Sequence, residues 1–253
     1  MVSKVETAAK FTSASQGWSQ REYRDAKSFM ERRARLVRDW GASLEPGDRI
    51  LELGCGDGSL CCHLAAQGFD VTGVDISPGM IDEAKRRAAA ERVEAKFELA
   101  DGDNFKVDRS YDAVVSFMGA FFTYLEDPAK FIATAIPFVR KKVILDWNFR
   151  SPGSFVDAAE VMQEAGLEHV EWRPWFIPHT TAGAANAGVR GWVEERPNLS
   201  LLGLIMKRWH YTVYLKGEKP GWNGNHANHA VQGNRLPGSL IQRSLIRLGQ
   251  LTR

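Results

Sequence analysis

The stretch that decides the fold is ILELGCGDGSL, residues 50–60. A short apolar run leads there into three glycines at alternate positions, Gly54, Gly56 and Gly58. A glycine inside a helix or strand costs about 0.5–1 kcal/mol relative to alanine, so three within five residues must serve a local purpose. A tight turn and a close approach of the backbone to a ligand are the two purposes that glycine suits.

The composition is that of an ordinary globular protein. The chain has 253 residues, of which 44% are hydrophobic and 25% charged, and its formal net charge is +2. This length suits one large domain or one domain with an appendage, and the small net charge argues neither for nor against nucleic acid. No apolar run approaches the ~20 residues that span a bilayer.

The cysteines and the N-terminus predict a cytoplasmic protein. Cys55, Cys61 and Cys62 lie close together in sequence and show neither a disulfide framework nor zinc-ligand spacing. The first 18 residues lack the apolar core of a signal peptide. We therefore expect three small, buried thiols in a reducing compartment.

Strand patterns and helix patterns alternate along the chain. We expect seven strands, at RILEL (49–53), DVTGVDI (70–76), AKFELA (95–100), YDAVVSF (111–117), KVILDW (142–147), HVEWRPWFI (169–177) and WHYTVYLKGEK (209–219). Strands that alternate with helices predict an α/β fold: a doubly wound, seven-stranded sheet with helices on both faces.

The residues before the first strand form a separate unit of the prediction. Residues 1–18 are expected to be a loose polar arm, followed by a helix over about 20–40. Ser19 with Glu22 three residues later has the pattern of a capping box at the start of that helix. Together they predict an N-terminal arm and cap helix over residues 1–44.

Ser-Pro pairs predict two later helix starts. Ser77 and Pro78 are expected to be the N-cap and first residue of the helix after the second strand. Ser151 and Pro152 are expected to start another helix, which ends near Gly166.

The rest of the chain divides into a domain and a tail. We expect the main domain over residues 45–217, with a lid-like insertion at about 178–208 where small and apolar residues interrupt the alternation. Residues 218–253 then form a basic tail, which from residue 219 on has five basic residues and no acidic one. Its leucines can share one face of an amphipathic helix, which could contact a membrane surface or dock on protein.

The glycines follow a strand at the carboxyl edge of the predicted sheet, where doubly wound folds bind ligands. Asp75 follows Gly54 by 21 residues and stands at the tip of the second strand. A carboxylate at that tip can accept both ribose hydroxyls of a nucleoside. A nicotinamide fingerprint would need Gly-x-Gly-x-x-Gly, but Gly58 comes one position early. We therefore predict a nucleoside-containing cofactor.

Residues 52–58, ELGCGDG, resemble the first motif of class I S-adenosylmethionine-dependent methyltransferases, (Glu/Asp)-x-Gly-x-Gly-x-Gly. The resemblance covers residues 45–150 well and 165–220 loosely. The late YTVYLKGEKP resembles the family's antiparallel strand 7, so the sheet should be mostly parallel with strand 7 antiparallel. The resemblance implies S-adenosylmethionine as the cofactor and methyl transfer by in-line displacement as the reaction.

The same resemblance implies a set of cofactor-binding residues, each with its own part of the cofactor. Tyr23, in the segment expected to cover the pocket, is counted among them. The others are Glu52, Gly54, Cys55 and Gly56 for the methionine and ribose part, Asp75 for the ribose hydroxyls, Ile76 beside the adenine, Asp101 and Gly102 at the adenine amino group, and Ser116, Phe117 and Met118 at the methionine end.

No motif identifies a general base. The two catalytic candidates are His179, just past the sixth strand, and Tyr124, where many relatives of the family carry histidine. His210 and Asp146 are further candidates, and a loop histidine without a catalytic duty is the alternative for His179.

No metal site is expected. His226 and His229 could pair as ligands, but no third ligand follows them in a fixed pattern.

The acceptor is predicted to be a small organic molecule or a lipid, methylated on O, N or C. Enzymes that methylate base or amide nitrogens often carry Asn/Asp-Pro-Pro-Tyr/Phe after strand 4, where this chain has SFMG, so no nucleic acid partner is expected. Aromatic residues in the arm and in the post-strand loops suit an apolar acceptor. The alternatives are another nucleoside-cofactor enzyme, such as an NAD-dependent oxidoreductase, and a non-catalytic S-adenosylmethionine-binding module.

Overall fold

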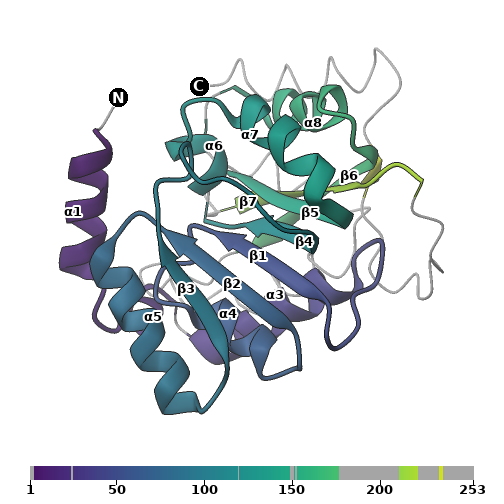
Figure 1. Cartoon of the computed structure of the whole chain (residues 1–253). Coiled ribbons are helices and arrows are strands. Elements are labelled where there is room, and N and C mark those ends of the chain that lie inside the picture. The colour runs from purple at the N-terminus through teal and green to yellow at the C-terminus, as the bar shows by residue number, and fades with distance from the viewer. Residues whose placement is uncertain are drawn as a thin grey trace, which may run out of the picture.

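The computed structural model describes residues 3–23, 25–118, 120–148, 151, 153–176, 211–221 and 234–235. One twisted sheet runs through the described part of the chain, with helices packed on both of its faces (Figure 1). Its strands are β1 (Arg49–Leu53), β2 (Asp70–Asp75), β3 (Ala95–Leu99), β4 (Tyr111–Ser116), β5 (Val139–Asn148), β6 (Glu168–Phe176), β7 (Tyr211–Glu218) and β8 (Asn234–Arg235).

The strand order is β3-β2-β1-β4-β5-β7-β6-β8. The strands from β3 to β5 pair in parallel, and β7 is antiparallel to both β5 and β6. The order reverses beside β1, because the chain moves outward to β3 on one side and then crosses to β4 on the other. This confirms the predicted α/β sheet with its antiparallel strand 7, to which the two-residue strand β8 is added at the β6 edge.

The helices form one layer on each face of the sheet. On one face lie α3 (Ala26–Asp39), α4 (Ser59–Ala65) and α5 (Pro78–Glu91), and on the other lie α6 (Ala120–Tyr124), α7 (Pro128–Ala135) with the 3₁₀ turn Ile136–Phe138, and α8 (Phe155–Glu164) (Figure 1). Two separate apolar clusters fill the spaces between these layers and the sheet. None of the described helices has the length and apolar character needed to cross a membrane.

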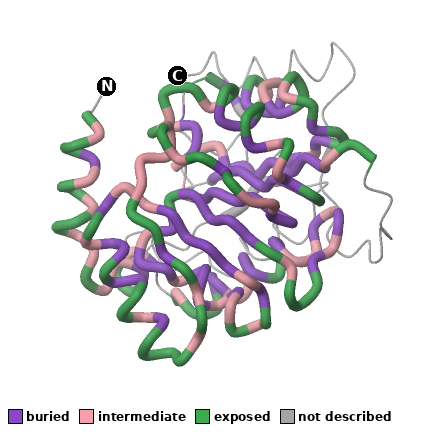
Figure 2. Tube along the Cα trace, viewed as in Figure 1, coloured by how far each residue is buried: buried purple, intermediate pink, exposed green. Residues whose placement is uncertain are grey.

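The central strands are buried on both faces (Figure 2). In β1, Ile50 joins the cluster under α3 and α4, whereas its neighbour Leu51 joins the cluster under α7 and α8. Alternate side chains of a strand point to opposite faces, so a strand covered on both sides must be apolar at nearly every position. The run ahead of the glycines meets this requirement.

The capping signals were right at one helix and wrong at another. The Ser77 side chain accepts a hydrogen bond from the amide of Met80, and Pro78 is the first residue of α5, as predicted. The last predicted helix, α8, starts later than expected. Its N-cap is Ser154, which forms a capping box with Asp157, and not Ser151.

The N-terminal segment differs from the prediction. The expected loose arm is a helix, α1 (Lys4–Ala14), which begins with a capping box between Ser3 and Glu6. The single helix expected over 20–40 is two helices, α2 (Trp18–Glu22) and α3, with Tyr23 in extended backbone between them. The predicted cap at Ser19 is wrong, because its hydroxyl donates to Asp57 and Asp25 caps α3 instead.

Candidate active site

A cavity of about 1020 Å³ opens at the carboxyl edge of the parallel strands. Its walls are the segments that follow β1, β2, β3 and β4, together with residues of α1, α2, α3 and α6. The volume lies at the upper end of the roughly 300–1,000 Å³ typical of small-molecule pockets. This is the edge at which doubly wound sheets bind their ligands.

Each of the three glycines has its own structural reason. All three have positive φ, at +68° for Gly54, +54° for Gly56 and +72° for Gly58, a region that other residues rarely adopt. A Cβ on Gly54 would lie 2.7 Å from that of Ala120, and one on Gly58 would lie 2.7 Å from that of Ala84. Gly56 has nothing within 4 Å of that position and lines the cavity. Two glycines therefore allow helices to pack closely, and the third leaves open space for a ligand.

Asp75 stands at the tip of β2 and also holds the glycine loop. Its Oδ2 accepts the amide of Gly56 at 2.9 Å, and its Oδ1 accepts the amide of Ser77 at 2.8 Å. Burial raises the pKa of this carboxyl, and the bonds from the backbone amides act in the opposite direction. The side chain lines the cavity, and a carboxylate can accept more bonds than these two.

Glu52 is an almost fully buried acid that faces the cavity from the end of β1. Burial raises its pKa to about 7, although a hydrogen bond from the Cys61 thiol, at 3.0 Å, and the charge of Arg33 both lower it. A carboxyl group with such a pKa is partly protonated at neutral pH, and a cationic ligand beside it would favour the charged form.

Asp101 and Gly102 line the far end of the cavity, in the loop after β3. Asp101 accepts hydrogen bonds from the amide of Asp103 at 3.1 Å and from Lys4 of α1 at 2.7 Å. A Cβ on Gly102 would lie 2.8 Å from Leu125. The segment from Ala120 to Leu125, which contains α6, therefore runs along one wall from the glycine loop to this end.

The three residues predicted for the methionine end come together at the opposite end of the cavity. The Ser116 hydroxyl donates to the carbonyl of Leu53 at 2.8 Å and so ties β4 to β1. Met118 has a φ of +65°, a conformation that costs a non-glycine residue energy and that often marks functional sites. Tyr23 donates its phenol to the sulfur of Met118 at 2.9 Å, and burial raises the pKa of Tyr23 to about 12.

Arg33 is a site residue that the sequence reasoning missed. Its side chain, on α3, is only 2% exposed and lies between the rings of Phe29 and Phe117, 4.4 Å and 4.8 Å from their centres. Nε donates to the hydroxyl of Tyr214 at 3.1 Å.

The terminal nitrogens of Arg33 contact two weak acceptors, the thioether sulfurs of Met30, 4.0 Å from Nη1, and Met118, 3.7 Å from Nη2. A buried cation that lines a cavity can bind an anion that enters it. The signal in the sequence was an arginine three residues after Met30 and four before Val37, on the apolar face of the helix.

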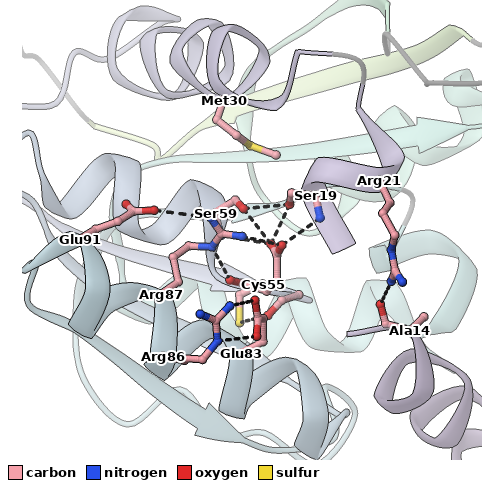
Figure 3. A network of polar contacts seen from close by, with 12 residues as sticks. Ala14, Ser19, Arg21, Met30, Cys55, Ser59, Glu83, Arg86, Arg87 and Glu91 are labelled. Carbon is pink, nitrogen blue, oxygen red and sulfur yellow. Dashed lines mark hydrogen bonds and ion pairs between the residues drawn. The ribbon is translucent and has the colours of Figure 1, made fainter. Parts of the chain in front are cut away.

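Asp57, inside the glycine motif, was also missed. Its buried carboxylate accepts hydrogen bonds from Ser19 and Ser59 and forms an ion pair with Arg87 at 2.9 Å (Figure 3). These partners belong to α2, α4 and α5. Asp57 therefore joins the helix that covers the cavity to the loop that forms its floor.

Two of the four catalytic candidates, Tyr124 and Asp146, lie in the described part of the chain. Tyr124 ends α6, lines the cavity and contacts the ring of Phe11 edge-on, with the two centroids 5.9 Å apart. Asp146 is fully buried in β5, accepts a hydrogen bond from the Thr212 hydroxyl at 3.1 Å, and is not among the cavity residues that the structure describes.

The histidine candidates lie outside the described residues. They are His179, His210, His226 and His229. Within the described part of the chain, no group of three His, Cys, Asp or Glu side chains could hold a metal ion.

The chain is similar to known methyltransferases. Residues 50–142 match the family model described as "Methyltransferase domain". Over 166 residues the chain is 33% identical to the ribosomal protein L11 methyltransferase of Thiobacillus denitrificans, covering 63% of this chain and 47% of that protein. Over 160 residues it is 31% identical to the ubiquinone biosynthesis O-methyltransferase of Alkalilimnicola ehrlichii, covering 59% and 62%.

The fold also resembles that of a solved methyltransferase. A TehB-like S-adenosylmethionine-dependent methyltransferase from Corynebacterium glutamicum superimposes with a TM-score of 0.55 at 21% identity, over 83% of this chain and 98% of that one.

The chain carries a methyltransferase domain over residues 50–142 and shares its fold with a solved S-adenosylmethionine-dependent methyltransferase. It spans less than two thirds of the length of the two curated relatives, one of which is named for a protein acceptor and the other for a small molecule's synthesis.

Proposed function

We propose that this protein transfers a methyl group from S-adenosylmethionine to a small organic or lipid acceptor. The observation that carries the proposal is the contrast between the two parts of one cavity. One part of its lining is the open Gly56 with the carboxyl groups of Glu52 and Asp75, and another part is aromatic side chains, among them Phe11, Trp18 and Phe121. The first suits a charged nucleoside cofactor, and the second suits an apolar acceptor.

The residues present fit the cofactor along its whole length. Asp75 would take the ribose hydroxyls with Ile76 beside the adenine, and Asp101 with Gly102 would meet the adenine amino group. At the methionine end, Glu52 would face the ammonium group. Arg33, whose terminal nitrogens contact thioethers, would face the carboxylate.

The loop residues complete this assignment. Gly54, Cys55 and Gly56 would lie under the methionine and ribose part. Ser116, Phe117, Met118 and Tyr23 close the methionine end, where Phe117 stacks on the guanidinium of Arg33 and Tyr23 bonds Met118.

When bound, S-adenosylmethionine supplies a methyl group on a positively charged sulfur, which is already a good leaving group. The chain's own task is to align the acceptor with that methyl group, and alignment can supply roughly 7–11 kcal/mol of a barrier. Apolar side chains around the reacting atoms exclude water, which would otherwise compete with the acceptor. Tyr124 and His179 remain our candidates for taking a proton from acceptors that must lose one.

Labelled methyl transfer tests this function. The full chain is incubated with S-adenosylmethionine that is labelled in its methyl group, together with pools of phenols, amines, carboxylates and lipids, and separately with ribosomal protein. We expect label in the low-mass or lipid fraction, and none when Gly56→Val is used. Label confined to protein would contradict the proposed acceptor class, and no transfer to any pool would favour a non-catalytic module.

We further propose a cytoplasmic location. Cys55, Cys61 and Cys62 are all free and buried, as expected where thiols stay reduced.

A further inference from the structure

Helix α1 lies across the adenine end of the cavity and is fixed at both of its ends. At its first turn, the Nζ atom of Lys4 lies 2.7 Å from Asp101, 2.5 Å from Asp103 and 3.5 Å from Glu126. At its last turn, the hydroxyl of Thr12 is hydrogen-bonded to that of Ser77 at 2.9 Å. The helix thus connects the loop after β3 to the first turn of α5.

Little apolar surface holds this helix down. Thr7 is its one buried residue, and Figure 2 shows the rest of α1 exposed or partly exposed. Among the described residues, neither hydrophobic cluster includes a residue of α1. A helix of 11 residues is marginal in isolation, so its place depends on the polar contacts at its ends and on Phe11. Elements held in this way open at low free-energy cost.

The contact at Lys4 falls on a residue that the cofactor would use. Asp101 is the proposed partner of the adenine amino group. Its Oδ2 accepts Lys4 and the side-chain amide of Asn104, at 2.9 Å, whereas its Oδ1 accepts the backbone amide of Asp103 and keeps a lone pair. One carboxylate can therefore hold the helix and the adenine together. A cofactor bound beneath α1 would then leave only after this helix has moved.

We propose that Lys4 is a positioning residue that holds α1 closed over the adenosine end of the cofactor and thereby sets the rate at which S-adenosylhomocysteine leaves. The inference rests on the proposed function, because it takes the cofactor to occupy this cavity. It is separate from any role in acceptor binding. Product release limits the turnover of many enzymes with closing elements, so Lys4 affects kcat through release and not through the methyl transfer step.

The test measures the release of labelled S-adenosylhomocysteine from the full chain into an excess of unlabelled compound. Lys4→Gln should release it roughly two- to fivefold faster at low salt, the factor that one partly exposed ion pair supplies. Lys4→Glu should be faster still, because it places a fourth carboxylate among Asp101, Asp103 and Glu126. Lys4→Arg should restore the parent rate.

Salt separates an ionic contact from a merely structural one. Release from the parent should accelerate as salt rises from about 0.05 to about 0.5 M. The Debye length shortens over this range, so ions screen an exposed ion pair more strongly. Release from Lys4→Gln should respond less. Lys130→Gln, an exposed lysine on α7 away from the cavity, is the matched control and should behave as the parent does.

The outcomes are distinguishable. Parental release rates in both Lys4→Gln and Lys4→Glu would overturn the assignment, and so would an equal salt response in all variants. A parent chain that binds no S-adenosylhomocysteine would overturn the proposed function, and this inference with it.

Discussion

Ser19 is bonded twice to Asp57: its amide nitrogen lies 2.9 Å from Oδ2, and its hydroxyl lies 2.7 Å from Oδ1. The two residues come from α2 and from the glycine motif, 38 positions apart, and both are buried. This contact fixes Trp18 and Tyr23, which line the cavity, relative to the loop that would carry the cofactor.

Removing either partner should destabilise the fold by different amounts. Asp57→Ala removes the buried carboxylate that pairs with Arg87 and accepts hydrogen bonds from Ser19 and Ser59, and it should lower the free energy of unfolding by about 3 kcal/mol. Ser19→Ala removes the hydrogen bond from the hydroxyl but keeps the one from the backbone amide, and it should lower the free energy of unfolding by about 1.5 kcal/mol. Denaturant unfolding measures both, with Ser13→Ala on the exposed side of α1 as a control that should stay within about 0.5 kcal/mol of the parent. Equal stability of the two serine variants would contradict the role given to Ser19.

Arg33→Met should weaken the binding of S-adenosylhomocysteine by about 1.5–3 kcal/mol, the range for a hydrogen bond to a charged group. Methionine keeps much of the buried volume but removes the cation that we assign to the methionine carboxylate. Binding of 5′-methylthioadenosine, which lacks that carboxylate, should change little. Arg35→Met, on the exposed face of the same helix, is the control. Equal losses for both ligands would show that Arg33 acts on the fold and not on the carboxylate.

Asp75→Ala should weaken cofactor binding by about 1.5–3 kcal/mol, because it removes the acceptor for the ribose hydroxyls and the hydrogen bond that holds the amide of Gly56. Gly56→Val should be worse, since a branched side chain would need φ near +54° and would enter the open space of the cavity. Calorimetric titration measures both. Asp70→Ala changes the half-exposed carboxylate at the other end of β2 and should bind normally. Parental affinity in the first two variants would mean that the site is misplaced.

Binding of S-adenosylhomocysteine should strengthen as pH rises from 6 to about 7.5. Burial raises the pKa of Glu52 to about 7, and the ammonium group of the ligand favours the charged carboxylate. Glu52→Gln should remove most of this pH dependence.

The folding stability of the ligand-free protein should show the opposite dependence on pH. Its folded state holds the Glu52 proton more tightly than the unfolded chain does, whose carboxyl has a pKa near 4.5. This residue's contribution to stability therefore falls as pH rises from 4.5 through 7. Parallel pH profiles for the parent and Glu52→Gln, in binding and in unfolding, would rule out Glu52 as the titrating group.

The parts of the fold and site that the sequence predicted are those with local causes. Gly54 directly follows the buried strand β1, Asp75 ends β2, and Ser77-Pro78 starts a helix within three residues of Asp75. Short-range patterns of this kind show where a strand stops and which side chain stands at its tip. The parallel order of the strands then brings those tips together, so a site assembled from strand ends is predictable from such patterns alone.

The missed features depend on partners that are distant in sequence. Nothing local to Lys4 indicates that Asp101, 97 positions away, will hold α1, and the polar surface of that helix resembles that of an unstructured arm. Arg33 interrupts an apolar helix face, and only the fold shows that this face borders a cavity. The edge strand β8 is two residues long, too short for any period to be recognised.

Calorimetric titration of the full chain with S-adenosylhomocysteine and, separately, with NAD tests the central claim most directly. We expect saturable binding of S-adenosylhomocysteine, its loss in Gly56→Val, and no heat of binding with NAD. Binding of NAD together with no response to S-adenosylhomocysteine would contradict the account.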